Sequence, residues 1–300
     1  MTTELVRVSD HRPIMDLVLD GLTSEHSRRA YKRSLLDFIA WRETQGNPPL
    51  IKATVNRYKV EVLEAAGLAP STINQRLSAI RKLATEAADN DIMPQEQANG
   101  INKIKGVKSA GTRLGNWLDR EAAQAALDLP DTTTLKGLRD RAILAVLLGA
   151  GLRRTEAADL TFDQVQMREA RWVIVDLTGK GNRVRSIPIA AWVKVALDGW
   201  AEAAGIDSGK VFRPMNRWGD LDGDQVTSQL IYRVAAEYVP DNVAAHDLRR
   251  TFAKLAHIGG APVEQIQLTL GHASLKTTEI YLGIEQDLTD APSDKLGLRL

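Results

Sequence analysis

The sequence has no cysteine among its 300 residues. Disulfide bonds, thiolate metal sites and cysteine nucleophiles are therefore excluded. Histidine is scarce as well: the five are His11, His26, His246, His257 and His272, and no two of them have a paired spacing of the HExxH kind. We therefore expect neither a structural zinc site nor another bound metal.

Long apolar runs are also missing. No run reaches the eighteen or so residues that a membrane-spanning helix needs, and the longest candidate, residues 142–152, is short enough to be a buried helix. Residues 1–20 carry acids among their apolar residues and lack the apolar core and cleavage site of a signal peptide. We expect a cytoplasmic protein with no membrane partner.

The sequence has no excess of charge of either sign, with 39 lysines and arginines against 38 acids. This balance argues weakly against a nucleic-acid partner, but the basic residues are clustered. Three clusters are candidate DNA-binding surfaces: Arg28, Arg29, Lys32 and Arg33; Arg76, Arg81 and Lys82; and Lys103, Lys105 and Lys108. Each cluster is equally compatible with an ordinary solvated face, so the composition permits DNA binding without requiring it.

The length suits two domains, and the first has the spacing of a helical one. Tyr31, Leu35, Phe38 and Ile39 recur at helical spacing within residues 24–41. Further helices are expected over residues 54–66 and from Ser71, which we expect to cap the third helix. We predict an N-terminal extension over 1–22, a helical core-binding domain over 23–99, and a basic, glycine-rich linker over 100–116.

The rest of the chain predicts a mainly helical domain with a small antiparallel sheet. A helix should begin at Asp119, and a strongly apolar one should cover residues 135–150. Within residues 171–189, strand-like apolar segments lie on both sides of a glycine turn. This pattern predicts a β-hairpin with Lys180 at its tip. Five further helices are expected over 191–203, 225–238, 246–258, 263–270 and 275–284. The fold class is mainly α, with this domain over 117–284 and a leucine-containing tail over 285–300.

Four short segments carry polar residues that neither a core nor a turn requires: GAGLRRTE at 149–156, TGKGNR at 178–183, HDLR at 246–249 and LGHASLKTTEIY at 270–281. Taken singly, their residues have simpler explanations. Tyr281 is typical of a half-buried helix tyrosine, His246 of a capping histidine, Arg249 of a surface ion pair and Lys180 of an exposed turn. Only their combination indicates a shared function.

Together, GLRRTE, TGKGNRVRSIPI, HDLRRTFA and LGHASLKTTEIY resemble the signature segments of the tyrosine recombinases, also called phage-type integrases. They occur in the family's order and at compatible spacing, and the resemblance extends over roughly residues 23–284. It implies six catalytic residues, none of them substituted: Arg153, Lys180, His246, Arg249, His272 and Tyr281. Glu156 would support them by pairing with an arginine or a histidine. Arg250 stands where the family often has a histidine.

The resemblance implies attack on a phosphodiester by Tyr281, whose phenol has an ordinary pKa of about 10. The pentacoordinate centre gains negative charge on its non-bridging oxygens, and Arg153 and Arg249 offer planar, permanently charged forks to hold them. The product would be a 3′-phosphotyrosine with a free 5′ hydroxyl. No ATP is expected, because the covalent link keeps the free energy of the phosphodiester. No metal or cofactor is expected either, because the arginines neutralise the charge that a metal would otherwise handle.

Other residues of the catalytic set would transfer the protons. His246 is the expected general base for the phenol, and Lys180 the general acid for the leaving 5′ oxygen. His272 would donate a hydrogen bond to a phosphate oxygen.

As partners, the resemblance implies double-stranded DNA with inverted half-sites around a short spacer, and four protomers on two synapsed duplexes. These would form a homotetramer, or a heterotetramer with a paralogue, and the tail over 285–300 would dock on a neighbouring protomer. The short N-terminal extension is closest to the simple Xer-like layout. Two alternatives stay open: relaxation of DNA like a type IB topoisomerase, and a non-catalytic DNA-binding accessory protein.

Overall fold

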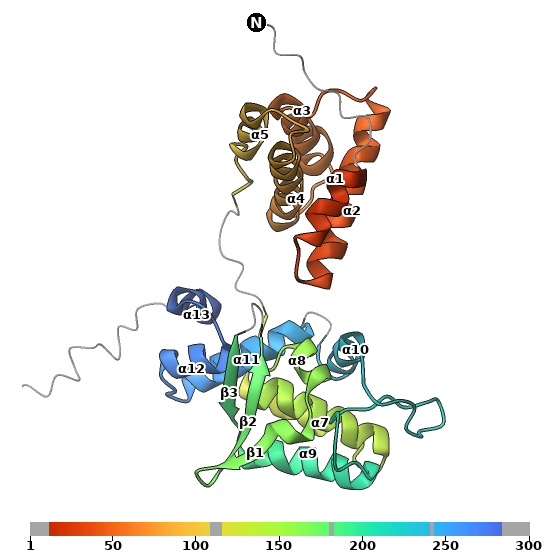
Figure 1. Ribbon diagram of the computed structural model, residues 1–300. Helices are drawn as coiled ribbons and strands as arrows, with labels where there is room; N and C mark the ends of the chain where they lie inside the picture. Colours follow the sequence, from red (N-terminus) through yellow and green to blue (C-terminus); the bar gives the residue numbers. More distant parts are fainter. Residues whose placement is uncertain (1–11, 109–115, 180–182, 241–242, 284–300) are drawn as a thin grey trace, which may run out of the picture. The chain divides into compact units, whose positions relative to one another are not determined.

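The computed structural model describes residues 12–108, 116–179, 183–240 and 243–283, and the chain divides into two compact units, Met1–Thr112 and Arg113–Leu300 (Figure 1). Each unit has its own hydrophobic core. The predicted fold class is confirmed, because the chain is mainly helical with one small antiparallel sheet. Among the described helices none is long and apolar enough to cross a bilayer.

All the secondary-structure elements described in the first unit are helices. Its elements are α1 (Arg12–Asp20), α2 (Glu25–Thr44), α3 (Lys52–Tyr58) continuing as a π-helix (Lys59–Glu64), α4 (Pro70–Asp89) and α5 (Gln95–Asn102). Ser24 caps α2 by accepting a hydrogen bond from the amide of Ser27. The third predicted helix forms, but Ser71 does not cap it. Pro70 takes the first helical position and Ala69 is the N-cap, because a proline loses nothing where no helical donor is needed.

Two segments of this unit differ from the expected boundaries. Within the predicted extension, α1 buries Ile14, Met15 and Val18 in the core that α2 and α4 share. Within the predicted linker, residues 100–102 belong to α5, and Ile101 and Ile104 are buried in the same core. In α1 the apolar residues Ile14, Met15 and Val18 have helical spacing, so this helix could have been predicted from the sequence.

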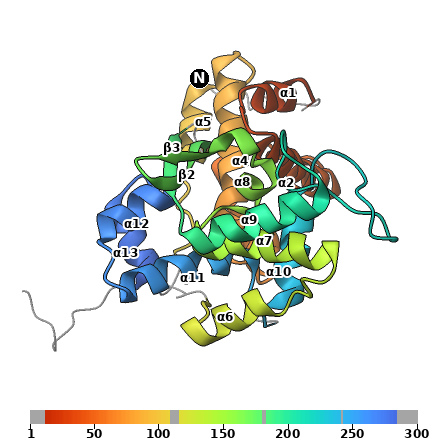
Figure 2. The ribbon, with the colours of Figure 1, turned by 90° about the horizontal axis from the view of Figure 1, so that it is seen from below.

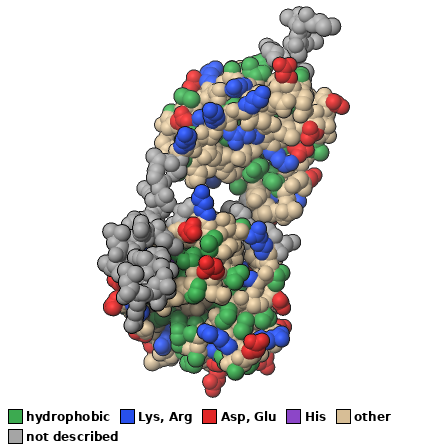
Figure 3. Space-filling model, turned by 90° about the vertical axis from the view of Figure 1, so that its left-hand side faces the viewer, with side chains coloured by type: hydrophobic (Ala, Val, Ile, Leu, Met, Phe, Trp, Pro, Cys, Tyr) green, Lys and Arg blue, Asp and Glu red, His purple; other side chains and the backbone are tan. Residues whose placement is uncertain are grey.

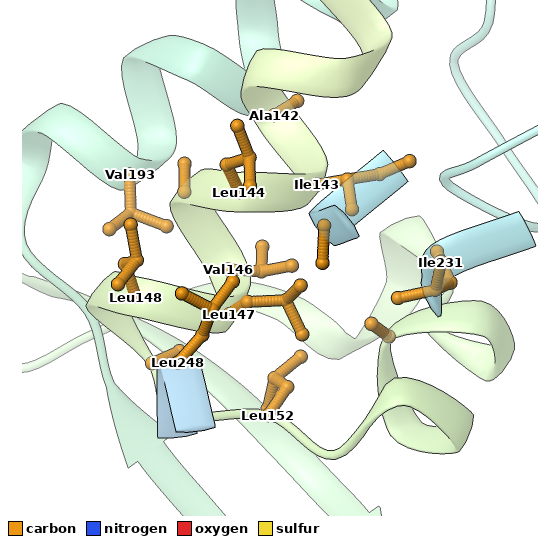
Figure 4. Close-up of a cluster of buried hydrophobic side chains, with 14 of the residues drawn as sticks. Ala142, Ile143, Leu144, Val146, Leu147, Leu148, Leu152, Val193, Ile231 and Leu248 are labelled. Atoms are coloured by element: carbon orange, nitrogen blue, oxygen red, sulfur yellow. The ribbon is translucent and has the colours of Figure 1, made fainter. Parts of the chain in front are cut away.

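The second unit surrounds one buried helix. Its elements are α6 (Arg120–Asp128), α7 (Leu135–Gly149), α8 (Arg154–Asp159), a 3-10 turn (Phe162–Gln164), β1 (Val165–Arg168), β2 (Arg171–Thr178), β3 (Val184–Pro188), α9 (Ala191–Ala204), α10 (Ser228–Tyr238), α11 (Ala245–Ile258), α12 (Val263–Leu270) and α13 (Leu275–Leu282). Figure 4 shows side chains of α7 meeting Val193 of α9, Ile231 of α10 and Leu248 of α11. An apolar helix enclosed by others suits a position without solvent. In Figure 2 α9 runs beside α7.

The sheet has the strand order β1-β2-β3, with both pairings antiparallel. The predicted hairpin corresponds to β2 and β3. The first strand was missed, because Glu169 and Ala170 form its two-residue turn to β2 with φ of 46° and 59°. Both residues of a tight turn of this kind need positive φ, and the sequence carries no Asn-Gly pair there to indicate it.

Candidate active site

The polypeptide between α7 and α8 places Arg153. After α7 the chain turns at Gly151, where φ is +60° and an added Cβ would lie 2.7 Å from the ring of Phe252. Arg153 is then the N-cap of α8, and the Glu156 carboxylate accepts hydrogen bonds from its backbone amide at 2.8 Å and from its guanidinium at 2.7 Å. A carboxylate in the first turn also satisfies a free amide and suits the helix dipole. The RRTE run therefore fixes Arg153 locally.

Arg249 comes from α11 and is 1% exposed. Its guanidinium donates hydrogen bonds to the backbone carbonyls of Gly151 and Leu270, and lies 3.8 Å from the Glu156 carboxylate. Burial, and then the charge of Arg153, lower the pKa of Arg249 to about 10. The side chain stays charged at neutral pH and is fixed by the turn after α7, by α8 and by α12.

Glu156 also pairs with Arg185, a residue that the sequence analysis did not single out. The Arg185 guanidinium donates to both Glu156 oxygens at 3.0 and 2.8 Å, and its Nε donates to the carbonyl of Thr269 at 2.8 Å. Burial opposes ionisation of Glu156, but hydrogen bonds from Arg185 and from the Arg153 amide lower its pKa to about 2. A signal was present: Arg185 lies two residues from buried Ile187 on β3, so both face inward.

Two histidines lie against Tyr281 of α13. The ring centroid of Tyr281 is 5.9 Å from that of His246, near the start of α11, and 5.3 Å from that of His272, which follows the left-handed Gly271 at the end of α12. The Tyr281 hydroxyl donates to the backbone carbonyl of His246 at 3.4 Å, a long hydrogen bond. The Nδ1 of His272 is 2.9 Å from the hydroxyl of Thr278.

Burial first, and then the nearby arginines, shift the pKa values of these three groups. Partial burial, and then Arg249, lower the pKa of His246 below its usual 6.5. The same two causes lower the pKa of His272 to about 4. Burial raises the pKa of Tyr281, although Arg249 and Arg250 act in the opposite direction. At neutral pH both imidazoles are uncharged and the phenol keeps its proton.

Five of the six predicted catalytic residues therefore gather in one place, together with Glu156. The sixth, Lys180, lies outside the described residues. The hairpin that carries it is held at its base, where the Gly179 amide donates to the carbonyl of Arg183 at 2.8 Å and Thr178 pairs with Val184.

The ten candidate DNA-binding residues all lie on the first unit, and they divide into two sets. Lys32, Arg33, Lys103, Lys105 and Lys108 are exposed, and Arg29 forms a long, exposed ion pair with Glu25 at 3.9 Å. Figure 3 shows lysine and arginine side chains over the face of this unit that is in view, with acids mostly at its edges.

The other set is engaged within the unit. Arg28 donates to the carbonyl of Leu22 at 2.7 Å, and Lys82 pairs with Glu86 at 2.6 Å. Arg76 pairs with Asp37 at 3.0 Å, and Arg81 donates to the carbonyl of Ile104. The basic face expected on α4 is therefore a set of partly buried contacts, because α2 and the segment after α5 pack over it.

Models of protein families match both units. The model described as the phage integrase family matches residues 116–287, more than half of the chain. The chain belongs to this family. A second model, described as the phage integrase N-terminal SAM-like domain, matches residues 14–90. The resemblance to tyrosine recombinases is confirmed, and with it the enzyme class of a site-specific recombinase.

Curated relatives agree with this assignment over most of the chain. The tyrosine recombinase XerC of Xylella fastidiosa (strain M23) is 27% identical over 266 residues, which cover 87% of each chain. XerC of Mycobacterium sp. (strain JLS) is 28% identical over 277 residues, covering 88% of this chain and 90% of the relative.

Solved structures share the fold. The post-cleavage complex of XerH recombinase with palindromic difH substrate superposes with a TM-score of 0.68 at 20% identity, covering 91% of this chain and 81% of XerH. A lambda integrase dimer bound to a COC′ core site superposes with a TM-score of 0.66 at 15% identity, covering 92% of this chain and 78% of the lambda integrase chain.

Proposed function

We propose that this family member recombines DNA at specific sites in the cytoplasm through a 3′-phosphotyrosine intermediate, without ATP or metal. The observation that carries the proposal is the convergence of Arg153, Arg249, His246 and His272 on Tyr281. These five residues come from the start of α8, from α11, from the turn after α12, and from α13, which are distant from one another in the sequence. Two cations and two neutral imidazoles around one phenol are what phosphoryl transfer to a tyrosine needs.

In the proposed step the Tyr281 oxygen attacks the scissile phosphorus. A bond forms between phosphorus and the phenol oxygen, and the bond to the 5′ oxygen breaks. Arg153 and Arg249 hold the non-bridging oxygens, where charge increases. Glu156 supports this role, because it orients Arg153 by two hydrogen bonds and lies beside Arg249. Rejoining is the reverse reaction with a different 5′ hydroxyl.

The lowered pKa values support the assigned proton transfers. Because His246 is neutral at physiological pH, it can accept the phenol proton as general base. If the Thr278 hydroxyl donates to Nδ1 of His272, the ring proton lies on Nε2, which can then donate to a phosphate oxygen. We assign the proton for the leaving 5′ oxygen to Lys180 by the family resemblance.

We propose that the helical domain binds DNA phosphates through its exposed basic residues, and that the catalytic domain predicted over 117–284 acts on the same duplex. Lys32, Arg33, Lys103, Lys105 and Lys108 are the side chains best placed for this. Binding should weaken steeply with salt, as phosphate contacts do. The partner would be double-stranded DNA with inverted half-sites, because XerH is seen bound to a palindromic difH substrate and a lambda integrase dimer to a COC′ core site.

We infer that recombination takes a tetramer in which the tail over 285–300 docks on a neighbouring protomer. The tail itself lies outside the described residues. The second unit offers a receiving surface: an apolar groove of about 800 Å³ between α6, α7 and α9, lined by Leu127, Leu138, Leu148, Trp192 and Val195. Trp192 and Val195 are exposed. Arg120 and Arg141 at the groove suit the acids of the tail, and its leucines suit the apolar lining.

The nucleophile is tested with a nicked suicide substrate, which releases the 5′ fragment and traps a covalent adduct. We expect wild type to give the adduct in EDTA and without ATP, and Tyr281→Phe to give none. The described part of the chain contains no group of three or more histidine, aspartate or glutamate side chains that could hold a metal ion. Tyr232→Phe is the matched control, since Tyr232 lies near the site on α10 without a proposed role. Adduct formation by Tyr281→Phe, or none by wild type, contradicts the proposal.

The two alternatives are separated by other assays. A type IB topoisomerase would relax a supercoiled plasmid that lacks any target site, whereas a site-specific recombinase would not. An accessory protein would bind DNA and leave the suicide substrate uncleaved.

A further inference from the structure

Arg250 is a second arginine on α11 whose position is not explained by the fold. It follows Arg249, which points to the carbonyls of Gly151 and Leu270. The Arg250 guanidinium instead lies over the ring of Tyr281, with its Cζ 4.7 Å from the ring centroid. The side chain is only 15% exposed. A guanidinium at this distance from an aromatic ring makes a cation–π contact.

The other contacts of Arg250 are weak. Its closest carboxylate is Asp247, at 3.9 Å on the same helix. Its Nε is buried and has no hydrogen-bond partner among the described residues. A buried guanidinium nitrogen without a partner costs free energy, so the ring of Tyr281 is the principal contact of this cation.

Besides Arg250, two histidines and several other charged groups surround Tyr281. The two histidines meet the tyrosine with rings nearly perpendicular, His246 at 71° and His272 at 82°. The charged groups that act on the phenol are Arg249, Arg250 and Asp247 of α11 and Arg153 at the start of α8. Among these, Arg250 is the one whose charge lies over the ring.

We propose that Arg250 is a positioning residue for the nucleophile, holding the ring of Tyr281 by its face and stabilising the phenolate that forms during attack. This role rests on the proposed function of Tyr281. A cation over the ring limits its rotation, and its attraction increases as the ring gains negative charge. Consistent with this, Arg250 acts to lower the pKa of Tyr281 while burial raises it.

The identity of the residue supports the proposal. In tyrosine recombinases this position often holds a histidine, as the sequence resemblance implies. A partly buried histidine at this position would be neutral at physiological pH, because burial and then Arg249 lower the pKa of both His246 and His272 here. Arginine keeps its charge, and its planar group can stack on a ring.

The test compares Arg250→Met, which removes the charge but keeps much of the length, with Arg250→Lys, which restores the charge. Lys254→Met is the matched control, because Lys254 lies one turn further along α11 and makes its own cation–π contact, 5.7 Å from the ring of Trp117. Two measurements are made: the pKa of the Tyr281 phenol in the free protein, by NMR of ¹³Cζ-labelled tyrosine assigned with Tyr281→Phe, and the pH profile of single-turnover cleavage at saturating protein.

We expect Arg250→Met to raise the phenol pKa, to slow cleavage at pH 7 about 10-fold, and to move the cleavage profile to higher pH. Arg250→Lys should restore part of each effect, and Lys254→Met should resemble wild type. If both Arg250 variants match Lys254→Met in phenol pKa and in pH profile, the inference is wrong. If Arg250→Met does not fold, as judged by circular dichroism, Arg250→Lys alone must show a smaller shift in the same direction.

Failure of the proposed function gives a different result. If Tyr281→Phe still cleaves, Tyr281 is not the nucleophile, and Arg250 has no role in catalysis even where the phenol pKa shifts. If Tyr281→Phe is inactive and the Arg250 variants behave like the control, only the role of Arg250 fails.

Discussion

At Glu156 one carboxylate accepts hydrogen bonds from Arg153 and Arg185 and lies 3.8 Å from Arg249. The side chain is 4% exposed. A buried acid is stable as an anion only when paired and hydrogen-bonded, and three arginines close together need a negative charge between them. Glu156 therefore stabilises the folded protein and also holds the three arginines of the site in place.

Glu156 makes stability depend on pH. Its pKa is about 2 in the folded protein, against an ordinary value of 4.5. Because the folded pKa is the lower one, the contribution is complete above about pH 4.5 and is lost as pH falls toward 2. We expect Glu156→Gln to lower the free energy of unfolding at pH 7 by about 3–5 kcal/mol, and to flatten its dependence on pH between 5 and 3.

Urea unfolding followed by tryptophan fluorescence measures this, because five of the six tryptophans lie in the second unit. Glu237→Gln is the control, since Glu237 forms an exposed ion pair with Lys136 at 2.7 Å. Such a pair contributes about 0–1 kcal/mol. Equal pH slopes for wild type and Glu156→Gln would show that Glu156 is not the linked group.

At the scale of residues, the sequence indicated the residues that we propose to react, but not all of their partners. Arg153, Glu156, Arg249 and Tyr281 lie in recognisable segments. Arg185 was overlooked, since its partners Glu156 and Thr269 lie 29 and 84 residues away, and no local pattern joins them.

At the scale of elements, the turn from α7 to α8 needs a glycine for two reasons. Gly151 has φ of +60°, and an added Cβ would meet Phe252 at 2.7 Å and Leu270 at 3.2 Å. Its carbonyl also accepts a hydrogen bond from Arg249. The end of α7 is therefore fitted against α11 and α12 without space for a side chain.

The control for this turn is Gly205, the C-cap of α9, which has φ of +63° and nothing within 4 Å of an added Cβ. We expect Gly205→Ala to cost about 1 kcal/mol, from backbone strain alone. Gly151→Ala should cost about 2 kcal/mol more, because strain and overpacking add, and it should slow cleavage by moving Arg153 and Arg249. The urea midpoints and the suicide-substrate rate measure both effects. Equal costs for the two variants would contradict the packing argument.

Most helices were predictable because their apolar residues repeat at helical spacing; α12 and the start of α7 match the expected residues. Elements without such a repeat were missed. The four-residue strand β1 is too short for an alternating pattern, and α5 packs against α4, which lies earlier in the chain.

For the whole molecule, the groove in the second unit and the tail lead to a prediction about assembly. Val195 is 69% exposed within the groove, whereas Leu129 is 63% exposed and outside it. If the tail of a neighbouring protomer docks in the groove, Val195→Glu should reduce cooperative binding to DNA with two half-sites about 10-fold. Binding to a single half-site should not change.

Gel-shift titration on the two DNAs measures this cooperativity. A chain that ends after residue 284 should lose cooperativity to a similar extent, and Leu129→Glu should keep it. If Val195→Glu lowers the stability of the isolated protein but leaves cooperativity intact, the groove is filled by the protein's own tail and docking on a neighbour is wrong.

The sequence by itself determined the fold class, the family and the side chains that we propose to react, because helical periodicity and the four segments are local patterns. Only the tertiary structure decided which cations are free and which are already paired. Arg76 and Arg81 were expected on a DNA-binding face but hold the first unit together. Arg185 and Arg250 were given no role from the sequence, but they lie at the candidate active site. Their roles depend on contacts between distant segments, which only the folded core brings within hydrogen-bonding or stacking distance.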